Sequence, residues 1–284
     1  MFTILRKLFW VSRPVSWVNT AFPFAATYLV INHVVDWQFI VGTLFFLIPY
    51  NLMMYGVNDV FDYESDIRNP RKGGVEGMRE QKAFHPTIIK AVWITSVPFV
   101  GYLLLTGTLL SNLVLIGLLF FVLAYSLAGL RFKERPVLDS ITSSIHFVGP
   151  MIYALSVVGF IPESIPYVAA FFLWGMASHA MGAVQDIIPD REGGLASIAT
   201  VVGAAGTMRF AFSLYVFASV LVLNQPYPYA FLAIPGALYA WNVLRYTRLD
   251  DKNSSVARGA WKRFMRLNLF TGFCVTVVLI VATF

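Results

Sequence analysis

The feature that most constrains this sequence is a succession of apolar segments, each long enough to cross a lipid bilayer. A helix needs about 20 mostly apolar residues to span the hydrocarbon core. Nine segments meet this requirement, at residues 16–33, 38–58, 87–107, 109–129, 138–160, 165–186, 203–223, 227–246 and 265–283. The predicted fold class is therefore all-α, a polytopic membrane protein with nine transmembrane helices. We expect residues 1–284 to form a single membrane-embedded domain.

The composition agrees with a membrane protein. Hydrophobic residues make up 58% of the chain and charged residues 13%, whereas soluble domains carry about a quarter charged residues. The apolar residues are spread over the whole chain, which excludes a soluble domain with one anchor or signal segment. The single cysteine, Cys274, excludes a disulfide framework.

Basic residues predict the orientation. All 21 Lys and Arg residues fall in the amino-terminal segment or in connectors and helix ends on one side of the nine-helix topology. The connectors on the other side contain no Lys or Arg, and their charged residues are the acids Asp36 and Glu163. Loops rich in Lys and Arg stay in the cytoplasm. We therefore expect an integral protein of a prokaryotic plasma membrane, with its amino terminus cytoplasmic and its carboxyl terminus opposite. Topology and anionic membrane lipid explain the net charge of +6 without nucleic acid.

Acidic residues gather where the second apolar segment ends, in the sequence YGVNDVFDYESDIRNPRKGG at residues 55–74. Asn58, Asp62 and Asp66 recur every four residues, so a helix continuing through them places all three on one face. Asp59 lies beside that face. We call these four residues the first acidic station.

A second acidic group, QDIIPDREGG, ends the sixth apolar segment. Asp186 and Asp190, the second acidic station, are four residues apart, and we expect Pro189 to distort that turn. The first station lies at the end of the second predicted helix and the second station at the end of the sixth, so the two occupy equivalent places four helices apart. Each station is followed by a basic, glycine-containing stretch. This match weighs against two merely solvated helix ends, because carboxylates four apart repel and are costly at membrane depth.

The density of carboxylates predicts a site for hard divalent cations. Mg²⁺ takes one or two carboxylates, keeps water ligands and bridges to phosphate oxygens. Two such stations would hold Mg²⁺ ions around a diphosphate, with Arg and Lys neutralising the remaining charge. Because the site opens into an apolar bundle, we expect an isoprenyl diphosphate, whose ionisation the metal and a dry pocket would assist.

With these motifs the sequence resembles the UbiA superfamily of intramembrane prenyltransferases. The family signatures Asn-x-x-x-Asp-x-x-x-Asp and Asp-x-x-x-Asp match the two stations. The resemblance covers nearly the whole chain, because three more stretches are similar to other family segments: SRPVSWVNT at residues 12–20, YSLAGLRFKERP at 125–136 and GLASIATVVG at 194–203. It implies a UbiA-like bundle with a cytoplasmic-side active site, Mg²⁺ dependence, and prenyl transfer to a hydrophobic acceptor.

The resemblance also implies roles for single residues, with Asp62 and Asp186 as the expected catalytic positions. The implied metal-binding residues are Asn58, Asp59, Asp62, Asp66, Asp186 and Asp190. The implied diphosphate-binding residues are Asn58, Arg68, Arg131, Lys133 and Asn19. For Asn19, an amide that packs between helices is an equally good explanation.

The residues around both motifs are most similar to the lycopene elongase branch of the family. That branch attaches C5 units from dimethylallyl diphosphate to the ends of lycopene, giving C50 carotenoids. The second station also departs from the quinone-making pattern, because Ile188 and Pro189 stand where consecutive acids are usual. The resemblance implies dimethylallyl diphosphate as donor and lycopene or another polyene as acceptor.

Two other functions fit parts of the sequence. An aromatic prenyltransferase making a quinone precursor would use the same metal chemistry with a longer donor. An ion-coupled transporter or channel would use carboxylates for a permeating ion, but would place ionisable groups nearer the midplane and on more helices. The nearly uncharged opposite half of the predicted bundle favours an enzyme.

Overall fold

The computed structural model describes residues 2–67, 78 and 80–283, and every regular element in these ranges is a helix. The chain divides into two compact units. The first comprises Met1–Phe132 and His146–Phe160, and the second comprises Lys133–Ile145 and Ile161–Phe284. The single-domain organisation expected from the sequence stays a prediction.

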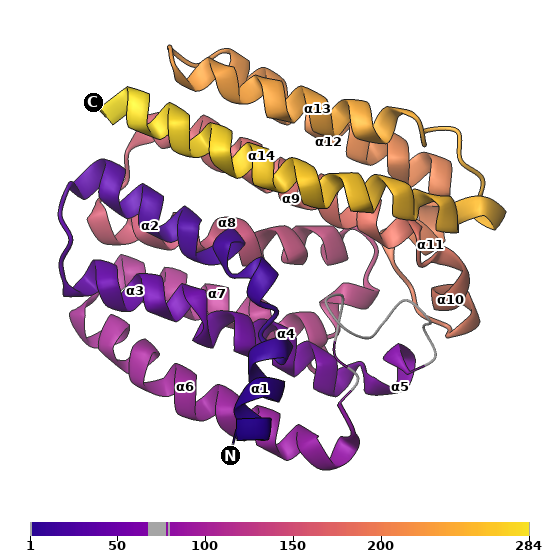
Figure 1. Cartoon of the computed structure of the whole chain (residues 1–284), viewed down its shortest axis with the longest axis horizontal. Helices are drawn as coiled ribbons and strands as arrows, with labels where there is room; N and C mark the ends of the chain where they lie inside the picture. The colour runs from indigo at the N-terminus through magenta and orange to yellow at the C-terminus, as the bar shows by residue number, and fades with distance from the viewer. Residues whose placement is uncertain (1, 68–77, 79, 284) are drawn as a thin grey trace. The chain divides into compact units, whose positions relative to one another are not determined.

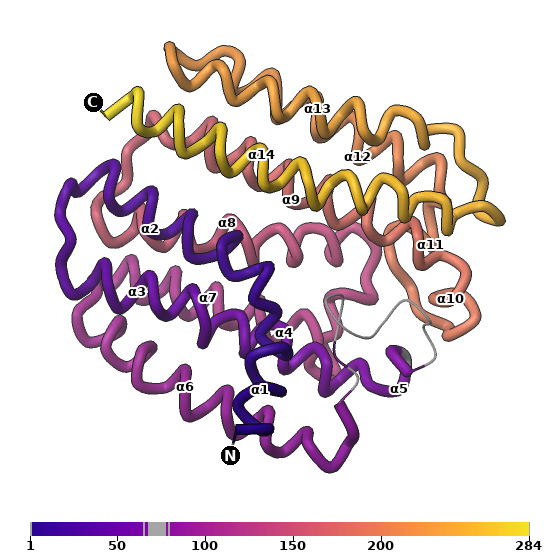
Figure 2. The backbone as a smooth tube through the Cα atoms, viewed as in Figure 1, coloured from indigo at the N-terminus to yellow at the C-terminus, as the bar shows by residue number. Residues whose placement is uncertain are grey.

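The first unit is built from the helices before residue 132 together with the second half of α8 (Figures 1 and 2). Its helices are α1 (Phe2–Val11), α2 (Val18–Asn32), α3 (Trp37–Leu47), α4 (Pro49–Phe61), α5 (Tyr63–Asp66), α6 (His85–Thr106), α7 (Leu109–Ser126) and α8 (Leu138–Val158). Helix α3 packs against α2 and α6, and α4 packs against α6 and α7. A Cβ atom on Gly42 of α3 would lie 2.3 Å from the Phe24 ring, so close packing of α2 on α3 requires glycine there.

The second unit contains the remaining helices, in orange to yellow in Figure 1 for its last three long members. They are α9 (Ile165–Val184), α10 (Ile187–Glu192), α11 (Ile198–Val202), α12 (Ala204–Leu223), α13 (Ala233–Leu244) and α14 (Arg258–Thr283). Helix α12 packs against α9 and α13, and α14 packs against α13 and α9. Stacked rings fill the core: Tyr215 and Tyr239 have centroids 5.3 Å apart, and Trp174 and Phe264 have centroids 5.7 Å apart.

Seven helical segments in the described ranges are long and apolar enough to cross a membrane. Shorter apolar helices, α2 and Tyr229–Leu244, occupy the predicted spans 16–33 and 227–246, so the count of nine spans stays a prediction. Large apolar side chains face outward, including Leu105, which is 89% exposed. Such exposed side chains are stable when lipid rather than water surrounds the helices.

The predicted span 38–58 is not one continuous helix, because it is broken at Ile48 between α3 and α4. Pro49 is the first residue of α4 and has no N–H to donate to the preceding turn. A proline at a first helical position fits the start of a helix but cannot continue one. The predicted span is therefore interrupted at Ile48, while Trp37–Phe61 as a whole is one of the candidate membrane spans.

Side chains repair the break. The Asn51 amide Nδ2 donates to the carbonyls of Phe46 and Leu47, at 2.9 and 3.1 Å, and to the Thr20 hydroxyl at 2.7 Å. That hydroxyl, on α2, donates in turn to the Phe46 carbonyl at 2.7 Å. Since no water reaches such groups in hydrocarbon, each unsatisfied carbonyl would cost several kcal/mol. Asn51 and Thr20 thus make the broken segment compatible with a membrane.

Replacing Asn51 with leucine should destabilise the protein, because the Leu47 carbonyl loses the Asn51 donor and the Phe46 carbonyl keeps only Thr20, next to a fully buried side chain. We expect the free energy of unfolding to fall by about 1–3 kcal/mol, measured as a lower thermal midpoint in detergent. Asn224→Leu is the matched control, since this exposed amide bonds only within its own helix turn. Equal midpoints for the two variants would contradict the assigned role of Asn51.

Candidate functional site

The first acidic station lies where α4 ends. Helix α4 stops at Phe61, Asp62 follows as its C-cap with φ −98° and ψ −2°, and α5 begins at Tyr63. The predicted helix through this region is therefore interrupted at Asp62. The spacing of the station survives, because Asp62 N–H still donates to the Asn58 carbonyl at 2.9 Å and Asp66 N–H donates to the Asp62 carbonyl at 2.8 Å.

Three of the predicted residues come together here. Asn58 Nδ2 donates to Asp62 Oδ2 at 2.8 Å and to the Ser126 hydroxyl, on α7, at 2.9 Å. The Arg131 guanidinium lies 3.9 Å from Asp62 Oδ1. Asn58, Asp62 and Asp66 are all buried. Ser126, which sequence reasoning missed, thus fixes the orientation of the Asn58 amide, and Arg131 places a positive charge beside the Asp62 carboxylate.

Asp59 is engaged differently. Its Oδ1 accepts from Arg13 Nη2 at 2.7 Å and its Oδ2 accepts from the Met78 N–H at 3.4 Å. The Arg13 guanidinium also lies 4.2 Å from the centroid of the Tyr55 ring. Arg13 has φ +50°, a left-handed conformation that L-residues rarely adopt and that needs support from its surroundings. Asp59 therefore secures the segment before α2, and its role as a metal ligand stays a prediction.

The second acidic station lies on a short separate helix. Helix α9 ends at Val184, Asp186 occupies the N-cap position of α10, and Asp190 lies within α10. The sequence predicts the two acids at the end of the sixth helix, with Pro189 distorting that turn; in the structure this helix ends at Val184 and a new helix begins at Ile187. Pro189 lies in the first turn of α10, where backbone N–H groups have no partner in the helix anyway, so the proline is tolerated. The Asp190 N–H donates to the Asp186 carbonyl at 2.9 Å, which keeps the two acids one turn apart.

A further acid, Asp139, stabilises the second unit and is not among the residues predicted from the sequence. Asp139, in the first turn of α8, is fully buried. Its Oδ2 accepts from the Ile198 N–H of α11 at 2.7 Å and its Oδ1 accepts from the Ser140 N–H at 2.6 Å. The Ser140 hydroxyl is 3.1 Å from His179 Nδ1 on α9. An isolated acid at the start of an apolar segment was the available sequence signal for this junction of α8, α9 and α11.

Three predicted diphosphate-binding residues remain. Asn19 is half-buried in the first turn of α2, and Lys133 is half-buried in the short helix Phe132–Glu134. Arg68 lies outside the described residues. The phosphate contacts of all three stay predictions.

The two stations offer oxygen ligands of the kind that a divalent cation binds. Within the described ranges, no three His, Cys, Asp or Glu side chains converge into a ready-made metal cage. Mg²⁺ does not need one, because it binds through one or two carboxylates and takes its other ligands from water and substrate phosphates. The buried oxygen donors of Asn58, Asp62 and Asp66, and separately those of Asp186, suit such an ion.

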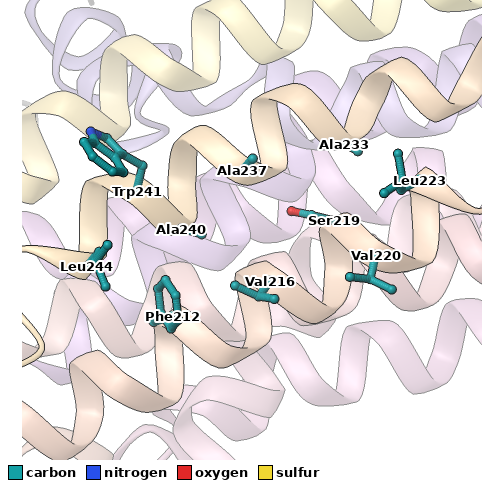
Figure 3. Close-up of a pocket in the computed structure, with 10 residues that line it drawn as sticks. All are labelled: Phe212, Val216, Ser219, Val220, Leu223, Ala233, Ala237, Ala240, Trp241 and Leu244. Atoms are coloured by element: carbon teal, nitrogen blue, oxygen red, sulfur yellow. The ribbon is translucent and has the colours of Figure 1, made fainter.

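An apolar groove of about 380 Å³ runs between α12 and α13 (Figure 3). Its lining includes Phe212, Val216, Ala237 and the exposed ring of Trp241, and all ten lining residues are uncharged. Without a charged group it suits a hydrocarbon chain and not a diphosphate.

Known sequences match almost the whole chain. Residues 20–271 fit the model of the UbiA prenyltransferase family. A lycopene elongase/hydratase of Corynebacterium glutamicum is 47% identical over 97% of both chains. A C50 β-cyclic carotenoid biosynthesis protein of Dietzia sp. is 49% identical over 98% of this chain and 65% of its own length.

Solved structures show the same fold at much lower identity. A UbiA homologue from Archaeoglobus fulgidus bound to DMAPP and Mg²⁺ superposes with a TM-score of 0.68 at 18% identity, covering 93% of this chain and 98% of the other. The apo structure of a UbiA homologue from Aeropyrum pernix gives 0.67 at 20% identity, covering 96% and 99%.

Breaking the ion pair between Arg13 and Asp59 should cost stability, because both side chains are largely buried, at 16% and 3% exposure. We expect Arg13→Met to lower the free energy of unfolding by about 3–5 kcal/mol, since it removes the opposite charge beside the buried Asp59 carboxylate. Adding Asp59→Asn should recover much of the loss by removing that charge. Thermal unfolding in detergent measures both variants.

The matched control is the pair of Lys82 and Glu64, whose side chains are 66% and 65% exposed. Lys82→Met should leave the thermal midpoint close to that of the wild-type protein, because solvent screens an ion pair between exposed side chains. A loss in Arg13→Met no greater than in Lys82→Met would refute the importance of the buried pair.

Proposed function

Because the chain belongs to the UbiA prenyltransferase family, we propose that it transfers the dimethylallyl group of dimethylallyl diphosphate to the ends of lycopene, in a Mg²⁺-dependent step of C50 carotenoid formation. The observation that carries this proposal is the pair of acidic stations in a chain that is 47% identical, over nearly its whole length, to a lycopene elongase/hydratase. The archaeal homologue bound to DMAPP and Mg²⁺ supports the choice of donor and metal.

The reaction begins with rupture of the bond between C1 of the dimethylallyl group and the diphosphate oxygen, releasing pyrophosphate and an allylic cation. The terminal alkene of lycopene supplies the electron pair for the new carbon–carbon bond. The resulting tertiary cation then loses a proton from a neighbouring carbon, or takes up water and releases a proton. Bound Mg²⁺ would supply positive charge that stabilises the departing pyrophosphate.

The residues of the first station would prepare this ionisation. Ser126 orients the Asn58 amide, and Asn58 in turn holds one oxygen of Asp62, so the donor oxygens are set before substrate arrives. Such preorganised groups avoid rearrangement during the reaction. Arg131, close to Asp62, would add positive charge where the diphosphate gathers negative charge. Arg68, Lys133 and Asn19 are proposed to contact the diphosphate as well.

The second station would hold its own Mg²⁺ through Asp186 and Asp190. Asp186 is buried at the start of α10, while Asp190 is partly accessible one turn later. This pair offers the one or two carboxylates that Mg²⁺ takes when phosphate and water complete its coordination.

The exposed apolar side chains on the helices indicate that the reaction takes place at a membrane. Lycopene is a hydrocarbon, so it would reach the enzyme through the membrane and not from water. The clustering of Lys and Arg predicts that the amino terminus and both stations lie on the cytoplasmic side, where the water-soluble diphosphate is made. We propose that the protein resides in a prokaryotic plasma membrane, in line with its bacterial relatives.

Replacing Asp62 or Asp186 with alanine should abolish transfer, because each change removes a buried carboxylate proposed to hold Mg²⁺. We expect pyrophosphate release from dimethylallyl diphosphate in the presence of lycopene to fall by at least about 100-fold. The mass of the pigments made in a lycopene-accumulating host provides a second readout, since C45 and C50 carotenoids should disappear.

Glu64→Ala is the control, because Glu64 lies on the same segment but is exposed and paired with Lys82. Wild-type rates in both Asp variants, with each protein inserted in the membrane, would refute the proposed metal stations. A wild-type protein that prenylates an aromatic acceptor and leaves lycopene unchanged would refute the acceptor.

A further inference from the structure

A closed ring of polar contacts lies next to the second station. Arg191, the neighbour of Asp190, donates through Nε and Nη2 to the Thr200 carbonyl of α11, at 3.2 and 2.7 Å. Its Nη1 lies 2.8 Å from Asp251 Oδ2. Asp251 Oδ1 accepts from the Ala204 N–H, the first residue of α12, at 2.7 Å. The ring therefore joins α10, α11, α12 and the 3₁₀ helix Asp251–Ala257.

The backbone leaves little freedom in this ring. Gly203, between α11 and α12, has φ +78°, and a Cβ atom there would lie 3.1 Å from Asp251 Oδ1. Glycine is thus needed both for the left-handed conformation and for the approach of the carboxylate. The other end of α11 is held by Asp139 through the Ile198 N–H. Helix α11, only five residues long, is thus held by Asp139 at its first residue and by Arg191 at the Thr200 carbonyl.

These contacts determine what Arg191 does. A basic residue beside a metal-binding acid suggests a phosphate ligand, but three of its N–H donors already serve Thr200 and Asp251. The two carboxylate oxygens of Asp251 likewise have separate partners, the backbone N–H at the start of α12 and the Arg191 guanidinium. In the ion pair the two opposite charges offset each other. Through Arg191, the last turn of α10 and hence Asp190 are tied to α11 and α12. The Leu195 N–H adds a bond to the Asp190 carbonyl at 2.8 Å.

We propose that Arg191 and Asp251 act as a positioning pair for the second acidic station, holding α10 so that Asp186 and Asp190 present their oxygens to Mg²⁺. This inference rests on the proposed function for the identity of the metal. Neither residue touches the metal or the diphosphate in this role. The loss of either one should weaken metal binding at the station, while kcat at saturating Mg²⁺ and donor stays near the wild-type value.

The test uses the full-length protein in detergent with Asp251→Asn, Arg191→Lys, Arg191→Gln and the double variant Arg191→Gln/Asp251→Asn. Mn²⁺, used in place of Mg²⁺, is titrated in the presence of pyrophosphate, and bound metal is counted by electron paramagnetic resonance. The Mg²⁺ dependence and the donor KM of pyrophosphate release are measured in parallel. Asp250→Asn is the matched control, because Asp250 is the adjacent acid but is exposed and, among the residues that the structure describes, bonds to Asn253 alone.

We expect Asp251→Asn and Arg191→Gln each to weaken Mn²⁺ binding and raise the Mg²⁺ requirement by about 10-fold or more, as outer-shell changes do in metal sites. Arg191→Lys should have a smaller effect, and Asp250→Asn none. The double variant should match the worse single variant, because one ring is broken in all three cases.

Different results would overturn the proposal. Loss of donor affinity in the Arg191 variants with a normal Asp251→Asn would make Arg191 a direct phosphate ligand. A lower thermal midpoint with unchanged Mn²⁺ binding would leave the pair a purely structural role. If the wild-type protein transfers no prenyl group yet Asp251→Asn still weakens Mn²⁺ binding, the positioning pair stands and only the proposed function fails.

Discussion

The structure depends on how it accommodates carboxylates at the ends of apolar helices. Removing a carboxylate from water costs several kcal/mol unless hydrogen bonds and opposite charges replace the lost hydration. Asp59, Asp62, Asp66, Asp139 and Asp186 are all buried. For Asp59 and Asp139 the partners come from distant parts of the chain, so the interactions that stabilise these acids also fix the segments around them.

Two kinds of buried acid result. Asp139 and Asp59 accept bonds from backbone or guanidinium donors and act as anchors, at the start of α11 and at the segment before α2 respectively. Asn58 and Asp62 instead bond to each other and lie beside Arg131, with Ser126 as their support. In the first kind, the carboxylate is engaged by donors of the protein itself and stabilises the fold. The second kind keeps oxygen donors grouped, which is what a site for a divalent cation requires.

The sequence predicted most of the long helices and the one-turn spacing of the acids because hydropathy and four-residue spacing are local properties. It did not predict the interruptions at Ile48, at Asp62 and between Val184 and Ile187. At Ile48 the break depends on the Asn51 side chain, which donates to carbonyls that the helix leaves without donors. Nor could spacing reveal Arg13 with Asp59 or Asp139 with Ile198, which are 46 and 59 positions apart. Such pairs exist only once distant helices have packed.

The break between α3 and α4 bears on how the chain enters the bilayer during synthesis. Asn51 belongs to the same segment as the Phe46 and Leu47 carbonyls it satisfies, whereas Thr20 belongs to the preceding helix. The segment from Trp37 to Phe61 therefore contains the donor for the carbonyls at its own break. These carbonyls are satisfied in lipid before the segment packs against α2. Insertion and tertiary packing can thus proceed as separate stages, with the Thr20 hydroxyl added when the two helices meet.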